Sequence, residues 1–558
     1  MTYVILQSCC NDASCVAVCP VNCIHPTPDE PEFMRAEMLH IDPETCIDCG
    51  ACVDECPVDA ILPEDELEDE QSRYLDLNAE YFEVHPIDPN PVTPARPWRK
   101  GDFGGLSVAV VGSGPAAFYA ALDLQALGAA RIEMFEKLLT PYGLARFGVA
   151  PDHQSTKAVT DMFRSLSNKK NFGLHLGVSV GQDITHADLL EHHDAVIYAV
   201  GASSDRKLGI EGEDLPGSHA ATDFVAWYNG HPDYANAQFD LSGERAVVIG
   251  NGNVALDVAR VLLADPDDLA RTDIADHAIE ALRDSSIREV VVIGRRGVAQ
   301  AAYTNPEMLS LLDLPDVDLV IDDAEVSIDG VTAAILESES TESSVRTKVS
   351  VAQEVADNPT TGSRKCLVLR YLLSPREIRG EGRVESLSLV RNRLEFDAEQ
   401  RITAVSTDET IDIDATLVLR SVGYRGKPIV DLPFDDRLGV VPNVDGRVVD
   451  PESGHAVEGV YVTGWIKRGP SGVIGTNKKC ATETVDSLLQ DYVDGKLEQP
   501  TASVDSFRPI VEERVSTALD FDGWLAIDKA ERAAGKKLSR PRVKFVSIES
   551  MMDVVRQA

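Results

Sequence analysis

The cysteine spacing of residues 46–57 constrains this chain more than any other feature. It reads Cys46-x2-Cys49-x2-Cys52-x3-Cys56-Pro57, a run in which three thiolates bind one iron–sulfur cluster and the fourth binds a neighbouring cluster. Residues 14–24 (SCVAVCPVNCI) match residues 51–61 (ACVDECPVDAI) at an offset of 37. The segment is therefore an internal repeat, and it predicts two clusters in one small domain.

The same offset predicts which side chains serve each cluster. The first half reads Cys9-x2-Asp12-x2-Cys15-x3-Cys19-Pro20, so a carboxylate replaces one thiolate. In the crossed arrangement a complete 4Fe-4S cluster takes four thiolates, and the second site has three. The second site is expected to hold a 3Fe-4S cluster, or a labile 4Fe-4S cluster whose odd iron takes Asp12 or water. The predicted metal ligands are Cys19, Cys46, Cys49 and Cys52 for the first cluster and Cys9, Cys15 and Cys56 for the second.

Two further cysteines, Cys10 and Cys23, have no counterpart in the repeat and are predicted to be buried non-ligands, as free cysteines often are. Structural zinc is the alternative for the whole set, because Cys-x2-Cys pairs are common in zinc sites. Two crossed Cys-x3-Cys-Pro units favour iron–sulfur clusters over zinc.

The charge excludes several classes of function. The chain has 558 residues and a formal net charge of −40. Such a surface repels phosphate backbones and anionic headgroups, so we expect no nucleic-acid or membrane partner. The sequence has no apolar run long enough to span a bilayer, and its first residues lack the features of an export signal. We therefore expect a cytoplasmic protein whose thiols are not a disulfide framework.

A strand and a glycine-rich turn predict the first dinucleotide site. Residues 107–111 are followed by Gly112-x-Gly114-x-x-Ala117 and a helical pattern, in which backbone N–H groups can approach a pyrophosphate. The next apolar segment, residues 131–136, ends in Glu136. An acid at this distance can accept hydrogen bonds from an adenosine ribose, although a solvated strand end is the alternative.

A second copy of this pattern carries the opposite charge. Residues 245–249 precede Gly250-Asn251-Gly252-Asn253-Val254-Ala255, and the following strand, residues 289–293, ends in Gly294-Arg295-Arg296. Paired arginines at the ribose position indicate a 2′-phosphate, although isolated arginines are more often surface charge. We therefore predict FAD in the first site and NADP in the second.

The order of these segments predicts the domain organisation. Apolar runs at 194–201 and 414–423 bracket the second turn, so the NADP domain is expected to be inserted in the FAD domain. The predicted fold is an α+β ferredoxin-like domain, then an α/β flavoprotein with two dinucleotide-binding domains, then a short C-terminal helical extension. The expected bounds are 1–82 for the ferredoxin domain, 83–106 for an acidic, proline-rich linker, 107–204 with 415–494 for the FAD domain, 205–414 for the NADP domain and 495–558 for the extension.

Two longer motifs carry a family resemblance. These are Phe135-Glu-Lys-x3-Pro141-Tyr-Gly-Leu-x-Arg-x-Gly-Val-Ala-Pro-Asp-His153 and Gly464-Trp-Ile-Lys-Arg-Gly-Pro-Ser-Gly472-Val-Ile-Gly-Thr476. With the double turn, residues 106–494 resemble adrenodoxin-reductase-like ferredoxin–NADP reductases. Residues 1–82 resemble seven-iron two-cluster ferredoxins. The whole chain resembles the actinobacterial ferredoxin/ferredoxin–NADP reductase fusion.

The resemblance implies the residues of both nucleotide sites and of the reaction centre. His153 and Glu307 are implied near the reacting rings, where His153 is expected to assist proton handling, although a histidine in such a turn is more often a loop anchor. In relatives a second acid follows Glu307 by one turn, and this chain has Ser310 there. The residues implied for FAD are Gly112, Ser113, Gly114, Glu136, Leu144, Val178, Trp465, Gly472, Val473 and Ile474; those for NADP are Arg206, Asn251, Gly252, Asn253, Val254, Arg295, Arg296, Glu307 and Gly472.

The predicted reaction joins a two-electron donor to one-electron centres. NADPH gives up a hydride, so FAD must accept the pair and pass single electrons to the clusters, which serve an external acceptor such as a ferredoxin or a haem mono-oxygenase. Two alternatives are an electron-input subunit of a larger amidotransferase or dehydrogenase, and a pure electron carrier. The arginine pair disfavours the carrier, because a scaffold has no use for a 2′-phosphate site.

Overall fold

The cysteine repeat is also a repeat of backbone conformation. The computed structural model describes residues 2–87, 96–129, 131–338, 341–358, 360, 362 and 365–558. In the front domain, left-handed backbone recurs at the offset of the sequence repeat, in the pairs Asn11 and Asp48 (φ 57° in both), Ala13 and Gly50, and Asn22 and Asp59. Each half of the repeat thus makes the same turns.

Short elements complete this front domain. Strand β1 (Tyr3–Ile5) pairs antiparallel with β4 (Ile61–Pro63), and β2 (Ile24–His25) pairs with β3 (His40–Ile41). The helices are α1 (Ser14–Val18), α2 (Ala51–Asp54) and α3 (Arg73–Val84), so the last helix runs two residues past the expected boundary at 82. The predicted linker 83–106 falls partly on residues 88–95, which lie outside the described residues.

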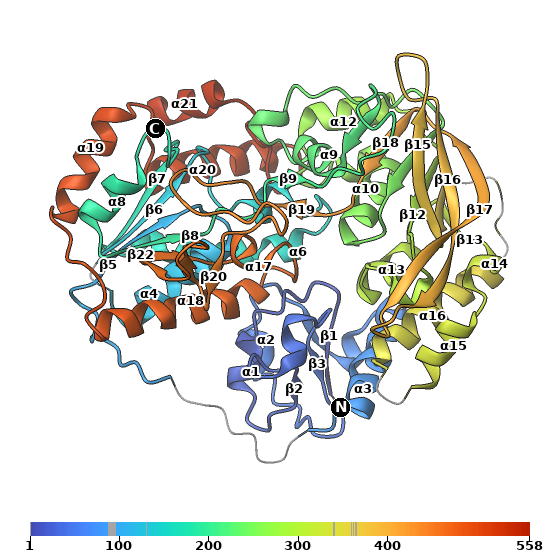
Figure 1. Cartoon of the computed structure of the whole chain (residues 1–558), viewed down its shortest axis with the longest axis horizontal. Coiled ribbons are helices and arrows are strands. Elements are labelled where there is room, and N and C mark those ends of the chain that lie inside the picture. Colours follow the sequence, from blue (N-terminus) through green and yellow to red (C-terminus); the bar gives the residue numbers. More distant parts are fainter. Residues whose placement is uncertain are drawn as a thin grey trace.

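A seven-stranded sheet forms the unit on the left of Figure 1. Its five parallel strands place the first glycine-rich turn at the centre, because β5 lies between β8 and β6. All five residues of β5 are buried, as expected for a strand covered on both faces. In order the strands are β20 (Asn443–Val444), β21 (Arg447–Val449), β22 (Ala456–Val462), β8 (Ala195–Tyr198), β5 (Ser107–Val111), β6 (Arg131–Glu136) and β7 (Phe172–Leu176).

Helices α4 (Pro115–Leu127) and α18 (Thr476–Val493) pack together below this sheet in Figure 1. The unit also contains α5 (Leu144–Phe147), α6 (Gln154–Lys157), α7 (Val159–Phe163), α8 (His186–His192) and α17 (Trp465–Arg468).

A six-stranded parallel sheet forms the second unit, on the right of Figure 1. Its order is β10 (Ser218–Ala220), β18 (Leu417–Arg420), β11 (Arg245–Ile249), β12 (Glu289–Ile293), β14 (Lys365–Arg370) and β13 (Val317–Ile321). A three-stranded antiparallel sheet of β15 (Leu373–Arg379), β16 (Ser386–Phe396) and β17 (Ile402–Asp414) stands beside it. The helices are α9 (Ala221–Tyr228), α10 (Asn253–Leu263), α11 (Pro266–Leu269), α12 (Asp276–Arg283), α13 (Asn305–Leu312), α14 (Asp323–Val326), α15 (Gly330–Glu337) and α16 (Ser343–Asp357).

One expected boundary is wrong. We placed residues from 415 onward in the first nucleotide domain, but β18 pairs between β10 and β11 of the six-stranded sheet. Its apolar run suits either sheet, so the sequence pattern did not discriminate. The chain crosses between the two units at β9 (Ser204–Asp205) and β19 (Tyr424–Arg425), which pair antiparallel with each other.

The last residues pack on both units. Helices α19 (Phe507–Arg514), α20 (Phe521–Lys537) and α21 (Ile548–Gln557) follow α18, and Trp524 is 1% exposed within the apolar core of the seven-stranded unit. Among the described residues, no helix combines the length and apolar character that crossing a membrane requires.

The front domain lies between the two units, at the bottom centre of Figure 1. Its own core is continuous with that of the six-stranded unit, while Cys10, Val58 and Ala60 belong to the apolar core of the seven-stranded unit. Helix α3 contacts α16, where Arg73 forms an ion pair with Glu354. The domain is thus docked against both units rather than held only by its linker.

Candidate cofactor sites

The first glycine-rich turn is shaped by close backbone approach. Gly112 has φ of +103°, and a Cβ there would lie 2.6 Å from the carbonyl oxygen of Ala199. Gly114 precedes α4, and a Cβ on Gly143 would lie 3.0 Å from its Cα. A Cβ on Gly464 would likewise lie 2.6 Å from Cβ of Ala116. Three predicted segments therefore meet at the N-terminus of α4, which is a favourable place for a pyrophosphate.

Glu136 faces this turn from the end of β6. Its Oε2 accepts hydrogen bonds from the backbone N–H of Ser113 at 3.1 Å and from its hydroxyl at 2.7 Å. Burial raises the pKa of Glu136, although the Ser113 hydroxyl opposes the shift. Val178 lies beside it, because its N–H donates to the carbonyl oxygen of Glu136 at 2.9 Å. This is the arrangement that a ribose-binding acid needs.

The other residues implied for FAD divide between two places. Leu144 begins α5, directly after Gly143. Trp465 begins α17, and its indole N–H donates to the carbonyl oxygen of Ser471 at 3.1 Å. The segment Gly472, Val473 and Ile474 leads from there into α18, with φ of +77° at Gly472.

The second turn repeats the first with different partners. Gly250 has φ of +113°, and a Cβ there would lie 2.1 Å from the carbonyl oxygen of Ser421. Gly252 precedes α10, in which Asn253 and Val254 form the first turn. A Cβ on Gly294 would lie 2.4 Å from the amide nitrogen of Asn251. The turn and the end of β12 are therefore adjacent, as the sequence predicted.

The arginine pair after β12 is the next feature of the second site. Within the described residues, neither the Arg295 nor the Arg296 guanidinium has a hydrogen-bond or ion-pair partner. Partial burial and the neighbouring Arg295 lower the pKa of Arg296. Two adjacent unpaired guanidinium groups are unusual in a chain with a net charge of −40, and they favour an anionic ligand. Arg206, also implied for NADP, is exposed after β9.

His153 and Glu307 come together around an arginine that the sequence did not identify. Arg260, 5% exposed in α10, contacts Asp152 at 2.6 Å, Asp257 at 2.6 Å and Glu307 at 3.4 Å. It also donates to Nε2 of His153 at 2.8 Å. Because Nε2 accepts, the imidazole proton resides on Nδ1, which lies 4.0 Å from the Glu307 carboxylate. Ser310 donates only to the carbonyl oxygen of Glu307.

This cluster is not a metal site. The ligand atoms of His153, Asp257 and Glu307 lie within 4.8 Å of one another. Arg260, however, donates a hydrogen bond to each of the three side chains. A fixed cation therefore already occupies the position that a metal ion would need.

The shifted pKa of Asp257 gives a testable pH dependence. Burial raises the pKa of Asp257 to about 6, against the opposing charge of Arg260 and with the repulsion of Glu307. The unfolded value is about 3.9, so the folded protein holds this proton more tightly. The stability contributed by this group is therefore fully present below about pH 4 and falls as the pH rises to about 6.

Asp257→Asn is accordingly expected to raise Tm relative to the parent at neutral pH, with the difference vanishing near pH 4. Thermal unfolding at several pH values measures this, with exposed Asp268→Asn as the control. A Tm difference that does not change with pH would contradict the assignment.

The seven predicted cluster ligands fall into two groups. Cys19, Cys46, Cys49 and Cys52 line one small cavity with Tyr3 and Ile47; we call this the outer site, since Cys49 is exposed. Cys9, Cys15 and Cys56 form the inner site, where Cys9 and Cys56 pack against the cores of both the front domain and the seven-stranded unit.

The two extra cysteines are both 3% exposed, in agreement with their expected burial. Cys23 lines the same cavity, with its Sγ 3.4 Å from Sγ of Cys19, whereas Cys10 belongs to the apolar core of the seven-stranded unit. That neither binds iron stays a prediction.

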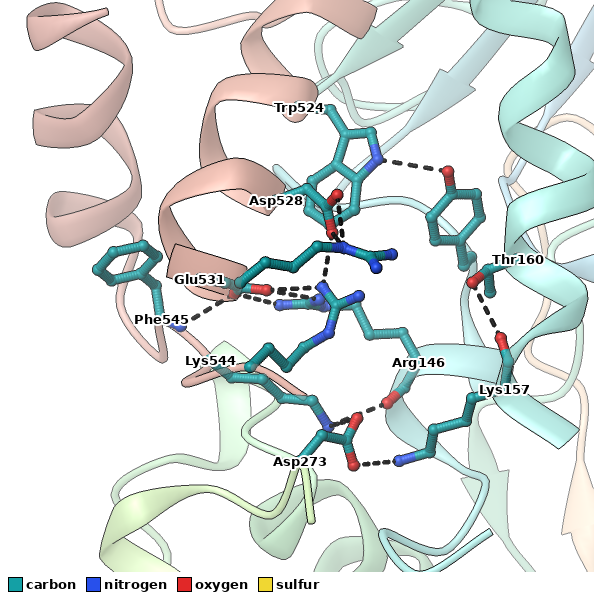
Figure 2. A network of polar contacts seen from close by, with 12 residues as sticks. Arg146, Lys157, Thr160, Asp273, Trp524, Asp528, Glu531, Lys544 and Phe545 are labelled. Atoms are coloured by element: carbon teal, nitrogen blue, oxygen red, sulfur yellow. Dashed lines mark hydrogen bonds and ion pairs between the residues drawn. The ribbon is translucent and has the colours of Figure 1, made fainter. Parts of the chain in front are cut away.

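The sequence also did not predict a network of buried charges in the C-terminal tail, residues 495–558. Figure 2 shows Glu531 of α20 receiving hydrogen bonds from Arg146 and from the backbone N–H of Phe545, with Asp528 one turn before it. Lys157 and Lys544 both reach Asp273 of the six-stranded unit, at 2.6 and 3.0 Å. Residues from three parts of the chain surround a cavity of about 150 Å³ here. The tail thereby fastens the two large units together.

A roomier cavity, about 630 Å³, lies at the amino ends of β11, β12 and β14. Ligands of open parallel sheets bind at the carboxyl ends of the strands, where both glycine-rich turns lie. The volume of this cavity therefore does not make it a nucleotide site.

Comparisons with known proteins agree with this geometry. Residues 106–296 match the family model described as "Pyridine nucleotide-disulphide oxidoreductase", and residues 39–62 match "4Fe-4S binding domain". A probable ferredoxin/ferredoxin–NADP reductase of Mycobacterium bovis is 48% identical over 100% of this chain and 96% of its own length.

Reductases without the front domain also match. NADPH–ferredoxin reductase FprA of Mycobacterium tuberculosis is 47% identical over 80% of this chain and 98% of its own length. The solved structure of FprA in complex with NADPH covers 81% of this chain and 99% of that chain, with 46% identity and a TM-score of 0.76.

Proposed function

The chain belongs to the ferredoxin/ferredoxin–NADP reductase family, and from this premise we propose that it is an NADPH-dependent ferredoxin reductase carrying its own ferredoxin. It oxidises NADPH and delivers single electrons through iron–sulfur centres to an external acceptor. The observation that carries this function is the pair of glycine-rich turns with opposite partners: an acid at the first, and at the second two arginines whose guanidinium groups are unpaired within the described part of the chain.

The first turn is assigned to FAD. Backbone N–H groups at the start of α4 bind the pyrophosphate, and Glu136 binds the ribose. Trp465 and the backbone of Gly472, Val473 and Ile474 hold the remainder of the cofactor. Bound FAD supplies the ability to take two electrons as hydride and to release them singly.

The second turn is assigned to NADP(H). Asn251, Gly252, Asn253 and Val254 bind its pyrophosphate, while Arg295, Arg296 and Arg206 select the 2′-phosphate. FprA has been solved with NADPH, which supports the same nucleotide here. We further assign the six-stranded unit as an NADP domain inserted in the FAD domain.

The residues of the Arg260 cluster are assigned to the reaction centre. Glu307 lies in the first turn of α13 and His153 immediately precedes α6, and Arg260 donates hydrogen bonds to both side chains. The role of His153 is to present a proton on Nδ1, and the role of Glu307 is to place its carboxylate beside that proton, 4.0 Å from Nδ1. A second carboxylate shuttle at Ser310 is not part of this proposal.

The outer site is assigned to a 4Fe-4S cluster, consistent with the matching 4Fe-4S family. The inner site, with three thiols, is assigned to a 3Fe-4S cluster or a labile 4Fe-4S cluster. We place the protein in the cytoplasm, with a ferredoxin or a haem mono-oxygenase as the external acceptor.

Anaerobic stopped-flow mixing with NADPH tests the function. Flavin absorbance is expected to bleach, followed by loss of the cluster absorbance, with NADH much slower. Iron and sulfide analysis with low-temperature EPR gives the cluster content, about seven irons for the 3Fe-4S assignment and about eight for the other. Absence of flavin bleaching would refute the proposed activity.

A further inference from the structure

Asp12 stands where the repeat would place a fourth cysteine of the inner site, but its carboxylate is engaged elsewhere. One oxygen accepts from the backbone N–H of Ser14 at 3.1 Å, and the other from the Ser14 hydroxyl and from Nζ of Lys478 at 3.3 Å. Lys478 also donates to the Ser14 hydroxyl at 3.0 Å. The Asp12 side chain is 4% exposed and that of Lys478 is 40% exposed, so a buried carboxylate of the front domain meets a half-exposed lysine of α18.

The backbone of residues 10–12 and the backbone of Gly475 lie in direct contact beside this ion pair. The N–H of Gly475 donates to the carbonyl oxygen of Cys10 at 2.6 Å, and a Cβ on Gly475 would lie 2.2 Å from the nitrogen of Asp12. Gly475 directly follows Gly472, Val473 and Ile474, the segment assigned to the flavin. Cys10 belongs to the same apolar core as Ala116 and Tyr119 of α4, the helix that begins at the first glycine-rich turn.

The two cluster sites therefore face different surroundings. The inner site adjoins the loop of residues 10–12, which contacts Gly475. Two of its thiols, Cys9 and Cys56, pack against the core of the seven-stranded unit. The outer site opens to solvent, with Ile47 57% exposed beside Cys49. Electron tunnelling slows steeply with distance, so the site nearer the flavin segment is the faster acceptor.

We propose that the inner site is the first acceptor of flavin electrons, that the outer site is the last, and that Asp12 is a docking residue for Lys478 rather than an iron ligand. This inference rests on the proposed function.

Each NADPH yields NADP⁺, one proton and two electrons. Each electron reduces the inner cluster, then the outer cluster, then one molecule of a one-electron acceptor, so two acceptors are reduced per NADPH and the proton goes to solvent.

The surface around the outer site indicates the acceptor. Between Arg35 and Arg73 the chain has thirteen Asp and Glu residues and no Lys or Arg. Asp48, Asp54 and Glu55 are exposed there, near Cys49. Such a surface favours an acceptor protein with a basic face, and cytochrome c serves as a basic one-electron probe.

Lys478→Met tests the docking contact in the full-length holoenzyme. Flavin bleaching by NADPH is expected to stay within about twofold, while cluster reduction, followed by rapid-freeze-quench EPR, slows at least about tenfold because a charged hydrogen bond at the contact is lost. Lys496→Met is the matched control, because Lys496 also pairs with carboxylates, those of Asp491 in α18 and Asp494 just after it. Among the described residues, no ion pair or hydrogen bond joins Lys496 to the front domain. Unchanged cluster reduction in Lys478→Met would overturn the role of Asp12.

Ligand variants test the order. In Cys49→Ser, NADPH is expected to reduce the inner cluster at the parent rate while cytochrome c reduction falls at least about tenfold. In Cys15→Ser, the flavin is expected to bleach while the outer cluster stays oxidised with NADPH but is reduced by dithionite. NADPH reduction of the outer cluster at the parent rate in Cys15→Ser would overturn the order.

If these variants lose both clusters, a measurement on the unmodified protein tests the order of the two sites instead. A soluble dysprosium chelate is expected to speed spin relaxation of the outer cluster and to leave the inner one unaffected. The reverse result would overturn the assignment. If flavin bleaching itself fails in the parent protein, the proposed function fails rather than the order of the sites.

Discussion

Replacing Arg295 and Arg296 together by alanine is expected to lower kcat/KM for NADPH by a factor on the order of 10²–10⁴, since each guanidinium contributes roughly 1.5–3 kcal/mol of charged hydrogen bonding to a phosphate. NADH lacks the 2′-phosphate, so its kcat/KM is expected to change by less than about twofold. The preference for NADPH would therefore largely disappear. Steady-state reduction of ferricyanide with each nucleotide measures both constants.

The double variant Arg393→Ala and Arg401→Ala is the control for this prediction. Both arginines are exposed in the same unit, with side chains 63% and 72% accessible, and both already pair with carboxylates. Their loss removes two positive charges without touching the proposed phosphate site. An equal fall in activity with NADPH and NADH in the Arg295 and Arg296 variant would show that these residues do not bind the 2′-phosphate of NADPH.

Glu531→Gln is expected to produce the largest loss of stability. Glu531 is fully buried and pairs with Arg146 and Arg542, which are 4% and 15% exposed. Removing its charge leaves two guanidinium groups without this partner, which costs about 3–5 kcal/mol. We expect Tm to fall by about 5–10 °C, measured by circular dichroism and by release of flavin fluorescence.

The matched control is Glu512→Gln on α19. Glu512 also pairs with an arginine, Arg508, but both side chains are more than half exposed, so the expected change is within about 0.5 kcal/mol. Equal Tm values for the two variants would show that the buried network contributes little to stability.

The sequence predicted the parts of the fold that local patterns determine. Strands β5, β6, β11 and β12 lie at the predicted residues, because buried parallel strands are short apolar runs and the glycine-rich turns mark where they end. The cysteine repeat predicted the two groups of thiols for a similar reason, because the spacing of cysteines along the chain determines which thiols can lie together.

Contacts between distant segments could not be predicted in this way. Arg260 lies in a helix that is apolar apart from Asn253 at its start and Asp257, and only Asp257, three residues before Arg260, indicates that a buried charge is needed there. Glu531 and its two arginines are 385 and 11 residues apart in sequence, and no local pattern links them. The run 414–423 was assigned to the wrong sheet because an apolar strand does not identify its neighbours.

The docking of the front domain was missed for the same reason. The sequence predicts Asp12 or water at the odd iron of the second cluster, because the repeat compares Asp12 only with Cys49. Its partner Lys478 lies more than 460 positions away. The substitution makes sense only once both surfaces are seen together.

The ladder between β9 and β19 has a consequence for how such proteins diversify. The polypeptide leaves the seven-stranded unit and returns to it on adjacent strands, which are separated by only about 4.8 Å. Everything between residues 206 and 423 is therefore a cassette whose ends already meet. Exchanging that cassette for one with a different nucleotide preference would leave the path of the flanking backbone unaltered. The replacement would have to restore the ion pairs of the C-terminal tail with Asp273 and Asp276.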